Sequence, residues 1–258
     1  MNNQKYSGNF YKYQGTGNDF VMIDNRDGQF PVSQAYIEHL CHRRFGIGAD
    51  GLILLQNDPD YDFRMVYFNA DGREGSMCGN GGRCTVRFAE DLGIFSGSTT
   101  FIAVDGEHEA TASSEVIALK MGEVHSREHH EAYDFMNTGS PHYVRYVEDI
   151  KNYDVFNEGK SVRYADEWVK RGGTNVNFVE KLDDETIYVR TYERGVEDET
   201  YSCGTGVTAC AISAHLKYKM PSPIKVITKG GNLQVAFDED FKSVHLIGPA
   251  VRVFNGEL

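Results

Sequence analysis

Two short, similar segments of the chain each begin with a cysteine followed by a glycine. Residues 78–84 read Cys-Gly-Asn-Gly-Gly-Arg-Cys, and residues 203–210 read Cys-Gly-Thr-Gly-Val-Thr-Ala-Cys. Their first cysteines lie 125 positions apart (203 − 78) in a chain of 258 residues, so each half carries one. Both segments lead into a helical pattern. Two equivalent thiols at two equivalent helix starts predict one sulfur on each face of a substrate.

A thiol at the first turn of a helix faces unpaired backbone N–H groups and the positive end of the helix dipole. Both effects favour the thiolate and predict thiol pKa values near neutrality for Cys78 and Cys203. The glycines of the two segments (79, 81, 82, 204 and 206) leave the backbone open, so the same loops can hold a carboxylate. Each segment therefore predicts a thiol and an anion site as one unit.

The reaction that suits two opposed thiols is inversion at a stereocentre. One thiolate removes the α-proton, and the opposite thiol delivers a proton to the other face. Two nearby thiolates would repel, so the pair is expected to share one proton. We expect no cofactor for this chemistry. Cys84, Cys210 and Cys41 are interpreted as small apolar core residues rather than reactive groups.

The duplication extends beyond the cysteines. Gly17 matches Gly139 at an offset of 122, residues 48–51 match 173–176 at 125, and residues 68–69 match 192–193 at 124. The anchors keep their order, which predicts two pseudo-symmetric lobes. We expect an N-terminal lobe at 1–124 that carries Cys78 and a C-terminal lobe at 125–248 that carries Cys203. A strand at 249–258 could return to the first lobe.

Hydrophobic periodicity predicts an α+β (mixed α/β) fold, in which a mixed, barrel-like sheet surrounds a central helix in each lobe. The active site is expected in the cleft between the lobes. Helices are predicted at 33–44, with Ser33 as N-cap, at 79–92 and at 204–217. The acidic, His-rich segment 122–133 is expected to be an exposed passage between lobes. Strands are predicted at 10–24, 51–56, 64–68, 99–104, 109–112, 116–121, 187–192, 224–228, 233–237 and 243–247.

Composition and charge limit the remaining function classes. The formal charge of −12 argues against nucleic acid as a partner, because phosphate binding needs clustered Lys and Arg. No apolar run approaches the length of a membrane span, and the N-terminus has no apolar signal region. The five cysteines show no metal-ligand spacing, so no metal is expected, and free thiols fit a cytoplasmic location.

Several blocks of the sequence together resemble the diaminopimelate epimerase family. They run in the family's order from about residue 10 to the C-terminus, and as a set they are highly specific. These blocks are residues 15–20 (Gly-Thr-Gly-Asn-Asp-Phe), 44–51 (Arg-Phe-Gly-Ile-Gly-Ala-Asp-Gly), 68–72, 77–84, 173–178, 192–195 and 202–206.

The resemblance implies an enzyme, an isomerase without pyridoxal phosphate that interconverts LL- and meso-2,6-diaminopimelate in lysine and peptidoglycan-precursor biosynthesis. It implies Cys78 and Cys203 as the acid/base pair, His142 and Glu193 as groups that tune the thiol pKa, and a homodimer. It also implies a set of residues that bind the substrate's carboxylate and ammonium groups: Asn18, Asn69, Gly79, Asn80, Asn175, Glu193, Arg194, Gly204 and Thr205.

Three departures from the family pattern affect the distal end of the substrate. Ser140 replaces an Asn found in many members, Gly51 replaces a Gln found in some, and residues 193–203 are one longer than in some. Three alternatives remain: a two-cysteine racemase of proline or hydroxyproline, a thiol redox protein cycling a Cys78–Cys203 disulfide, and a non-enzymatic amino-acid binder.

Overall fold

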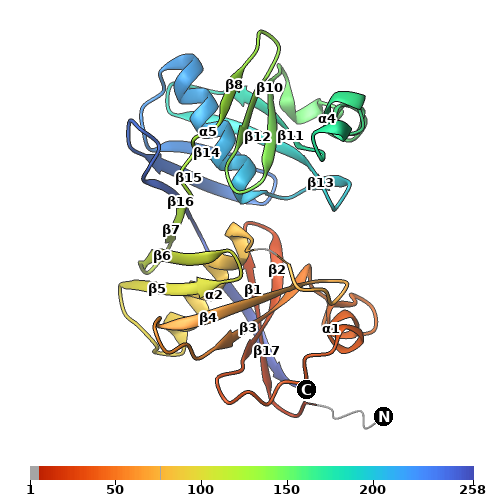
Figure 1. Ribbon diagram of the computed structural model, residues 1–258, viewed down its shortest axis with the longest axis vertical. Helices are drawn as coiled ribbons and strands as arrows, with labels where there is room; N and C mark the ends of the chain where they lie inside the picture. Colours follow the sequence, from red (N-terminus) through yellow and green to blue (C-terminus); the bar gives the residue numbers. More distant parts are fainter. Residues whose placement is uncertain (1–5, 76) are drawn as a thin grey trace. The chain divides into compact units, whose positions relative to one another are not determined.

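The computed structural model describes residues 6–75 and 77–258. The chain divides into two compact units. Unit 1 lies within residues 1–119 and 249–258, and unit 2 spans residues 120–248. Both units combine many strands with few helices (Figure 1), which confirms the predicted α+β class.

Unit 1 is built from a mixed sheet that curves around one helix, α2 (Gly79–Asp91). Neighbouring strands pair in the order β17, β1, β2, β3, β4, β5, β6 and β7, with parallel pairs only at β2–β3 and β4–β5. The strands are β1 (Asn9–Gly15), β2 (Asn18–Asp24), β3 (Gly51–Gln56), β4 (Phe63–Asn69), β5 (Ser98–Ala103), β6 (Gly106–Ala112), β7 (Ile117–Met121) at the unit boundary and β17 (Val251–Glu257). A short helix, α1 (Gln34–Cys41), packs beside β3.

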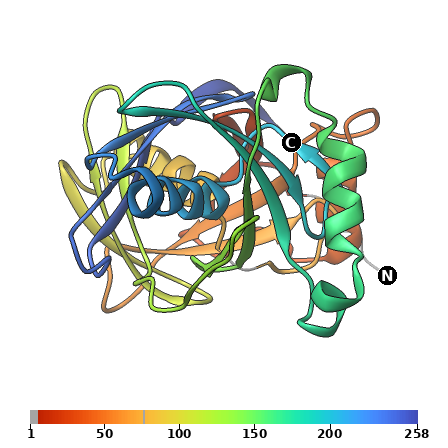
Figure 2. The same ribbon diagram turned by 90° about the horizontal axis from the view of Figure 1, so that it is seen from above.

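Unit 2 repeats this plan around α5 (Gly204–Tyr218). Neighbouring strands pair in the order β9, β10, β11, β12, β14, β15 and β16. The pairs β10–β11 and β12–β14 are parallel and the others in this series are antiparallel, which is the same succession as from β1 to β7. These strands are β9 (Asp134–Asn137), β10 (Pro141–Tyr146), β11 (Asn175–Lys181), β12 (Thr186–Glu193), β14 (Ile224–Thr228), β15 (Gly231–Phe237) and β16 (Val244–Gly248). Figure 2 shows α5 enclosed by the strands of its own unit.

The remaining elements of unit 2 extend its sheet and its surface. β8 (Arg127–His129) pairs with β9, and β13 (Asp198–Thr200) pairs with the end of β12. A 3-10 turn at Ile150–Asn152 precedes α3 (Val155–Arg163) and α4 (Asp166–Lys170). The helix α3 packs on β11 and β12.

The two central helices are buried except at their C-terminal ends, which explains their apolar and glycine-rich composition. Val86 and Phe88 of α2 and Cys210 and Ile212 of α5 are fully buried. Burial raises the pKa of Cys84 to about 12 and that of Cys210 well above its usual range. These two cysteines are therefore core residues, as predicted.

Two predicted elements differ from the structure. The strand expected at 10–24 is divided into β1 and β2, because Thr16 and Gly17 adopt φ values of 50° and 85° and turn the chain. The helix expected at 33–44 ends at Cys41, since His42 is extended, and the Ser33 side chain makes no capping hydrogen bond. Hydrophobic periodicity does not detect a two-residue turn. It also does not show whether the side chain of an N-cap residue makes a capping hydrogen bond.

The segment 122–133 is not simply an exposed passage. Val124 is only 2% exposed, and residues 127–129 form β8. The strand was not predicted because its residues are mostly charged. A strand with one solvated face needs apolar residues on the other face only, so a short one shows little hydrophobic pattern. The helices α3 and α4 were not predicted, since their apolar stripe is short and rich in charged residues.

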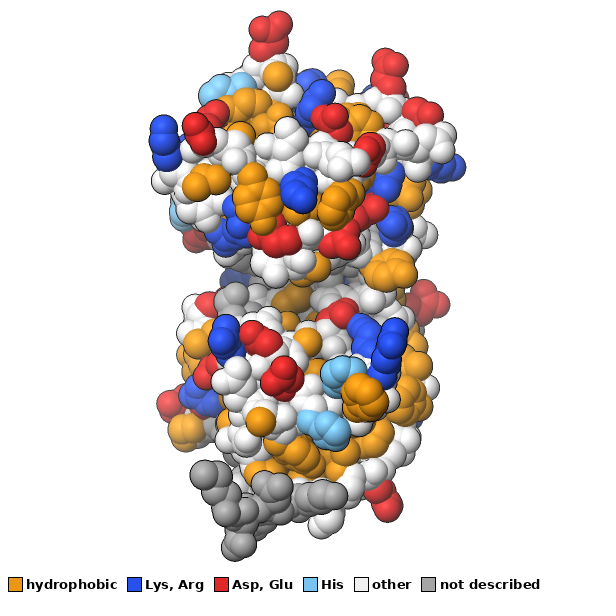
Figure 3. Space-filling view, turned by 90° about the vertical axis from the view of Figure 1, so that its right-hand side faces the viewer, with side chains coloured by type: hydrophobic (Ala, Val, Ile, Leu, Met, Phe, Trp, Pro, Cys, Tyr) orange, Lys and Arg blue, Asp and Glu red, His pale blue; other side chains and the backbone are white. Residues whose placement is uncertain are grey.

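The described surface mixes both signs of charge. On the face shown in Figure 3, acidic and basic side chains are interspersed over each unit. Among the described residues, no helix is long and apolar enough to cross a membrane.

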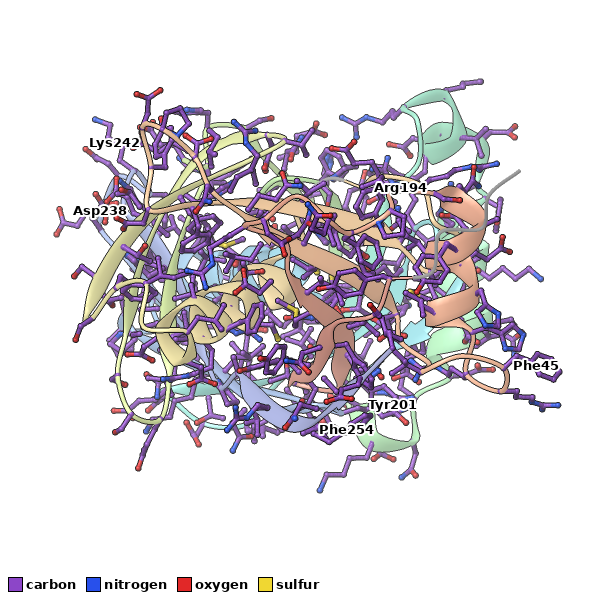
Figure 4. All side chains as sticks on the ribbon, turned by 90° about the horizontal axis from the view of Figure 1, so that it is seen from below. Phe45, Arg194, Tyr201, Asp238, Lys242 and Phe254 are labelled. Carbon is purple, nitrogen blue, oxygen red and sulfur yellow. The ribbon has the colours of Figure 1, made fainter. Side chains whose placement is uncertain are left out.

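The packing of α2 predicts a large loss of stability when Phe88 is truncated. Its ring is fully buried and lies 5.0 Å and 5.6 Å (centroid to centroid) from the rings of Tyr11 and Tyr13. Phe88→Ala should lower the free energy of unfolding by about 3–5 kcal/mol, measured by urea denaturation. Phe45 is 74% exposed and extends outward (Figure 4), so Phe45→Ala should change stability by less than about 0.5 kcal/mol. Similar losses in both variants would contradict this account of the core.

Candidate active site

Cys78 and Cys203 occupy the same position in their units. Each is the N-cap of the central helix, with φ and ψ of −102° and 129° for Cys78 and −117° and 114° for Cys203. Each carbonyl accepts the first helical hydrogen bond, from Gly82 N at 2.7 Å and from Val207 N at 2.9 Å. Neither cysteine side chain makes a capping hydrogen bond, but both residues stand at the open N–H groups of a helix, where negative charge is stabilised.

In unit 1 the Cys78 thiol lies within a group of polar side chains. Its sulfur is 3.6 Å from Asn18 Oδ1, and Asn80 Nδ2 donates to the same oxygen at 3.4 Å. Asn18 begins β2, and Asn80 stands in the first turn of α2. The structure thus brings three of the predicted site residues together within one unit.

Asn18 is oriented by a carboxylate. Its Nδ2 donates to Asp50 Oδ2 at 2.7 Å, and Asp50 is ion-paired with Arg43 at 2.6 Å. Arg43 also pairs with Asp19, which accepts from Lys12 at 2.7 Å. Burial alone would raise the pKa of Asp19, but the hydrogen bonds and charges of Arg43 and Lys12 lower it to about 2. This ion cluster fixes which way the Asn18 amide points.

Arg83 lies behind the same helix start and is fully buried. In the described part of the chain it forms no ion pair; its guanidinium instead donates to neutral oxygens. These acceptors are Thr16 Oγ1 (3.2 Å), Asn80 Oδ1 (3.1 Å) and the carbonyls of Gly79 (3.5 Å) and Pro249 (3.5 Å). Burial lowers the pKa of Arg83, yet an arginine keeps its charge in proteins, so the N-terminus of α2 gains a fixed positive charge.

In unit 2 the sulfur of Cys203 faces hydroxyl groups. It lies 3.5 Å from Thr205 Oγ1, which is 2.8 Å from His142 Nε2 and 3.1 Å from Ser140 Oγ. Ser140 Oγ is also 2.9 Å from His142 Nε2. Cys203, Thr205 and His142, all predicted site residues, therefore belong to one hydrogen-bonded group.

His142 is a fully buried, neutral imidazole. Burial, together with the charge of Arg194, lowers the pKa of His142 to about 3. Asn177 Nδ2 donates to His142 Nδ1 at 3.1 Å, and Thr191 Oγ1 donates to Asn177 Oδ1 at 2.9 Å. Asn177 Nδ2 donates also to the carbonyl of Tyr143. Because Nδ1 is an acceptor, the proton of the neutral ring is on Nε2.

The other predicted residues of unit 2 surround this group. Asn175 Nδ2 donates to Ser140 Oγ at 3.2 Å, and its Oδ1 accepts from the backbone N–H of Arg194 at 2.9 Å. The Arg194 side chain is exposed (labelled in Figure 4), and its Nη1 donates to the carbonyl of Gly172. Glu193 Oε2 accepts from Thr200 Oγ1 at 2.8 Å.

The remaining predicted positions are less closely connected. Asn69 ends β4 and is exposed, and its backbone closes the turn to Gly72. Gly79 and Gly204 are the first residues of α2 and α5, where their N–H groups belong to the open helix ends. A side chain on Gly51 would meet the Phe68 carbonyl oxygen at 2.5 Å, which explains why glycine stands there.

Sequence reasoning missed three residues that orient the predicted ones: Asp50, Asn177 and Thr191. Asp50 and Asn177 lie inside quoted motifs, at 48–51 and 173–178, so the motifs contained the signal. Their roles depend on which side chain each amide and carboxylate contacts, and spacing does not reveal that.

Solved structures share this fold. A PhzF-family phenazine biosynthesis protein of Bacillus anthracis matches with a TM-score of 0.75 at 15% identity, over 98% of this chain and 99% of that chain. A probable proline racemase of Agrobacterium radiobacter matches with a TM-score of 0.68 at 14% identity, over 97% and 92%. A hydroxyproline epimerase of Agrobacterium vitis gives 0.68 at 13%, over 98% and 91%. The fold is therefore that of the PhzF and proline racemase-like epimerases.

Sequence comparison is more specific than the fold. The family model for diaminopimelate epimerase matches residues 10–126 and 135–253. A diaminopimelate epimerase of Flavobacterium psychrophilum is 52% identical over 250 residues, 95% of this chain and 97% of that protein. One of Aquifex aeolicus is 41% identical over 96% and 97%. The chain belongs to the diaminopimelate epimerase family, as the sequence motifs indicated.

The close approach of α5 to His142 predicts different outcomes for two equivalent glycines. A Cβ on Gly206 would lie 2.5 Å from Asn177 Oδ1 and 3.2 Å from the His142 ring. Gly206→Ala should therefore cost about 1–3 kcal/mol of unfolding free energy and reduce epimerisation. At the matched position (206 − 125 = 81), a Cβ on Gly81 would meet the flexible ends of Ile53 and Met65 at 3.2 Å and 3.4 Å and the Phe20 ring at 3.5 Å, an ordinary van der Waals distance.

Gly81→Ala is the control, and its stability should stay within about 1 kcal/mol of the parent because alanine also favours the helix. Thermal denaturation and a turnover assay of both variants provide the measurement. Equal stability and activity of the two variants would show that the side chains of His142 and Asn177 can move to make room for the added methyl group.

The depressed pKa of His142 predicts a dependence of stability on pH. The unfolded histidine binds a proton below its ordinary pKa of about 6.5, whereas the folded one stays neutral until about 3. Stability should thus fall by about 1.4 kcal/mol per pH unit, from about pH 6 to about pH 4, relative to His142→Gln. Denaturant titrations of both proteins across this range test the difference. Parallel curves would indicate a protonated His142 in the folded state.

Proposed function

We propose that the protein interconverts LL- and meso-2,6-diaminopimelate by transferring protons between Cys78, Cys203 and the substrate α-carbon. The observation that carries this proposal is the similar N-cap geometry of the two cysteines, in two units whose strands pair in the same succession. The family membership supports the isomerase class and the substrate. Lysine biosynthesis follows from that substrate.

The proposed reaction requires the two sulfurs to flank one tetrahedral carbon. One cysteine acts as thiolate and takes the α-proton, and the other acts as thiol and donates its proton to the opposite face. The pair begins and ends with one proton, so the roles are exchanged after each turnover and no external acid or base is consumed. Only protons move, and the steps need no cofactor.

A thiolate is far too weak a base to ionise an α C–H bond unaided, so the site must stabilise the carbanion. We propose that the reacting carboxylate accepts from the N–H groups at the starts of α2 and α5, around Gly79–Asn80 and Gly204–Thr205. Buried Arg83 adds positive charge behind α2. Fixed dipoles of this kind need no reorganisation as charge develops on the substrate.

The distal end of diaminopimelate carries a second carboxylate and a second ammonium group. We propose that the exposed Arg194 guanidinium binds this carboxylate and that Glu193 and the amides of Asn18, Asn69 and Asn175 bind ammonium groups. His142 and Glu193 are proposed to tune the thiol pKa values. A compact imino acid such as proline has no distal groups for Arg194 to contact.

Two further expectations concern assembly and compartment. The described cysteines are all free, and a mechanism based on thiols requires a reducing compartment, which supports a cytoplasmic location. Strand β17 exposes Val251 (46%), Val253 (56%) and Phe254 (47%). Exposed apolar side chains clustered on one strand favour association, and we propose that they contribute to a homodimer.

Incubation with LL-diaminopimelate in deuterated water tests the reaction. A two-base enzyme should place solvent deuterium at the α-carbon mainly in the inverted product at early times, because the proton donor is on the opposite face. NMR of substrate and product measures this. L-proline and trans-4-hydroxyproline serve as controls, and turnover of these alone would contradict the proposed substrate.

Removing either sulfur should abolish inversion. Cys78→Ala and Cys203→Ala are each expected to lower kcat by at least about a thousandfold, since each removes one proton-transfer group. Cys84→Ala, which alters a buried core thiol, is the matched control and should retain most activity. Full turnover by either N-cap variant would refute the pair.

Phe254→Asp should weaken the proposed dimer, because it places a charge in an apolar contact. Sedimentation velocity should show a shift towards monomer. Phe45→Asp, at a residue that is 74% exposed, should leave the oligomeric state unchanged. A parent protein that sediments as a monomer would end this part of the proposal.

A further inference from the structure

The two cysteines have matched surroundings whose hydrogen bonds run in opposite directions. By the offsets of the repeat, Asn80 corresponds to Thr205 (80 + 125), Asn18 to Ser140 (18 + 122) and Asp50 to Asn175 (50 + 125). In unit 1 the Asn18 side chain is the donor, because its Nδ2 donates to Asp50. In unit 2 the corresponding Ser140 side chain is the acceptor, because Asn175 Nδ2 donates to it.

The direction in unit 1 leaves an acceptor facing Cys78. Asp50 is ion-paired with Arg43, so its carboxylate can only accept and holds the Asn18 amide nitrogen. The Asn18 oxygen is thereby turned to the Cys78 sulfur at 3.6 Å. A carbonyl oxygen accepts a proton from a thiol but repels a thiolate, so this contact favours protonated Cys78.

The direction in unit 2 leaves a donor facing Cys203. Two N–H groups point at the hydroxyl pair Ser140 and Thr205: Asn175 Nδ2 at 3.2 Å from Ser140, and His142 Nε2 at 2.8 Å from Thr205. The His142 tautomer is fixed by Asn177, whose own oxygen accepts from Thr191.

Counting protons favours one direction for the last bond of unit 2. Ser140 accepts from Asn175, and among the side chains that it contacts Thr205 is the one that can accept its proton, because His142 Nε2 is itself a donor. Thr205 therefore has its hydroxyl proton available for the Cys203 sulfur at 3.5 Å. A hydroxyl donor stabilises a thiolate.

We propose that, in the resting enzyme, Cys203 is the thiolate and Cys78 is the thiol of the pair. The assignment makes Asp50, Asn177 and Thr191 positioning residues, which act through Asn18 on one side and through His142 and Thr205 on the other. It rests on the proposed function, because the two cysteines must act as one acid/base pair. It implies that the substrate whose α-proton faces Cys203 reacts without a prior proton shift.

Charged groups lie near both cysteines. On the Cys78 side, Arg83 favours a thiolate, but its hydrogen bonds go to neutral oxygens rather than to sulfur. The ion cluster around Asn18 joins two carboxylates and two cations, Asp19, Asp50, Lys12 and Arg43. On the Cys203 side, His142 is neutral and Arg194 lies close enough to His142 to lower its pKa. The Asn18 oxygen at Cys78 and the Thr205 hydroxyl at Cys203 favour opposite protonation states.

The test measures each thiol pKa separately. In Cys78→Ala the rate of Cys203 alkylation by iodoacetamide is followed against pH, and in Cys203→Ala that of Cys78, with mass spectrometry locating the label. Cys203 should titrate at least about one pKa unit below Cys78, since one hydrogen bond to a charged group is worth about that much. A lower pKa for Cys78 would overturn the assignment.

Two substitutions test the cause. Thr205→Val should raise the pKa of Cys203 by about one unit, while Thr205→Ser, which keeps the hydroxyl, should not. Asp50→Asn frees the Asn18 amide to turn and should lower the pKa of Cys78, whereas Asp19→Asn removes a charge from the same cluster and should change it less. Circular dichroism verifies folding of each variant. An unshifted Cys203 in Thr205→Val would refute the role of the hydroxyl.

Failure of this inference differs from failure of the proposed function. If both alanine variants lose turnover but Cys78 has the lower pKa, the pair stands and only the resting proton is misplaced. If either alanine variant keeps full turnover, the pair itself is wrong, whatever the two pKa values are.

Discussion

The open N-terminus of a buried helix is the feature on which the rest of the molecule depends. Each central helix must leave its first N–H groups unpaired, and in both units the residue at that point is a cysteine. Enclosure by strands of the same unit keeps these N–H groups in a fixed direction. The N–H groups that the helix itself cannot pair are thereby available to stabilise negative charge on sulfur and substrate.

The two units reach similar backbone geometry through different side chains. Unit 1 places a buried arginine and an ion cluster around its cysteine, and unit 2 places a neutral histidine and hydroxyl groups. Two units of similar fold therefore surround their cysteines with different charges and hydrogen-bonding groups. Such a difference suits an enzyme whose two substrate forms, LL and meso, are not mirror images of one another.

Much of the fold could be predicted because the glycine and cysteine segments are unusual. The helices expected at 79–92 and 204–217 are found at 79–91 and 204–218, and the closing strands from 224 onwards agree within about two residues. The turn at Thr16–Gly17, the strand at 127–129 and the helix at 155–163 were missed. Each depends on a local φ value, a pairing partner or a short apolar face that sequence periodicity does not encode.

The structure groups several of the predicted site residues, through connections that the sequence did not reveal. Asn18, Asn80, His142, Asn175 and Thr205 each lie in a hydrogen-bonded group beside a cysteine or linked to one. The orienting side chains were not found, since their effect depends on amide orientation, which only contacts define. Asp50 lies in a repeated family block and Thr191 in a predicted strand, and neither pattern reveals which side chain each residue contacts.

The last strand of the chain has a consequence for biosynthesis on the ribosome. β17 pairs with β1 from Asn9–Glu257 to Gln14–Val251, so the first unit in sequence is completed by a strand that is translated after the whole of the second unit. Residues 120–248 form a continuous unit and need nothing further downstream. The nascent polypeptide can therefore fold its second unit first, while its first unit waits until β17 has been synthesised.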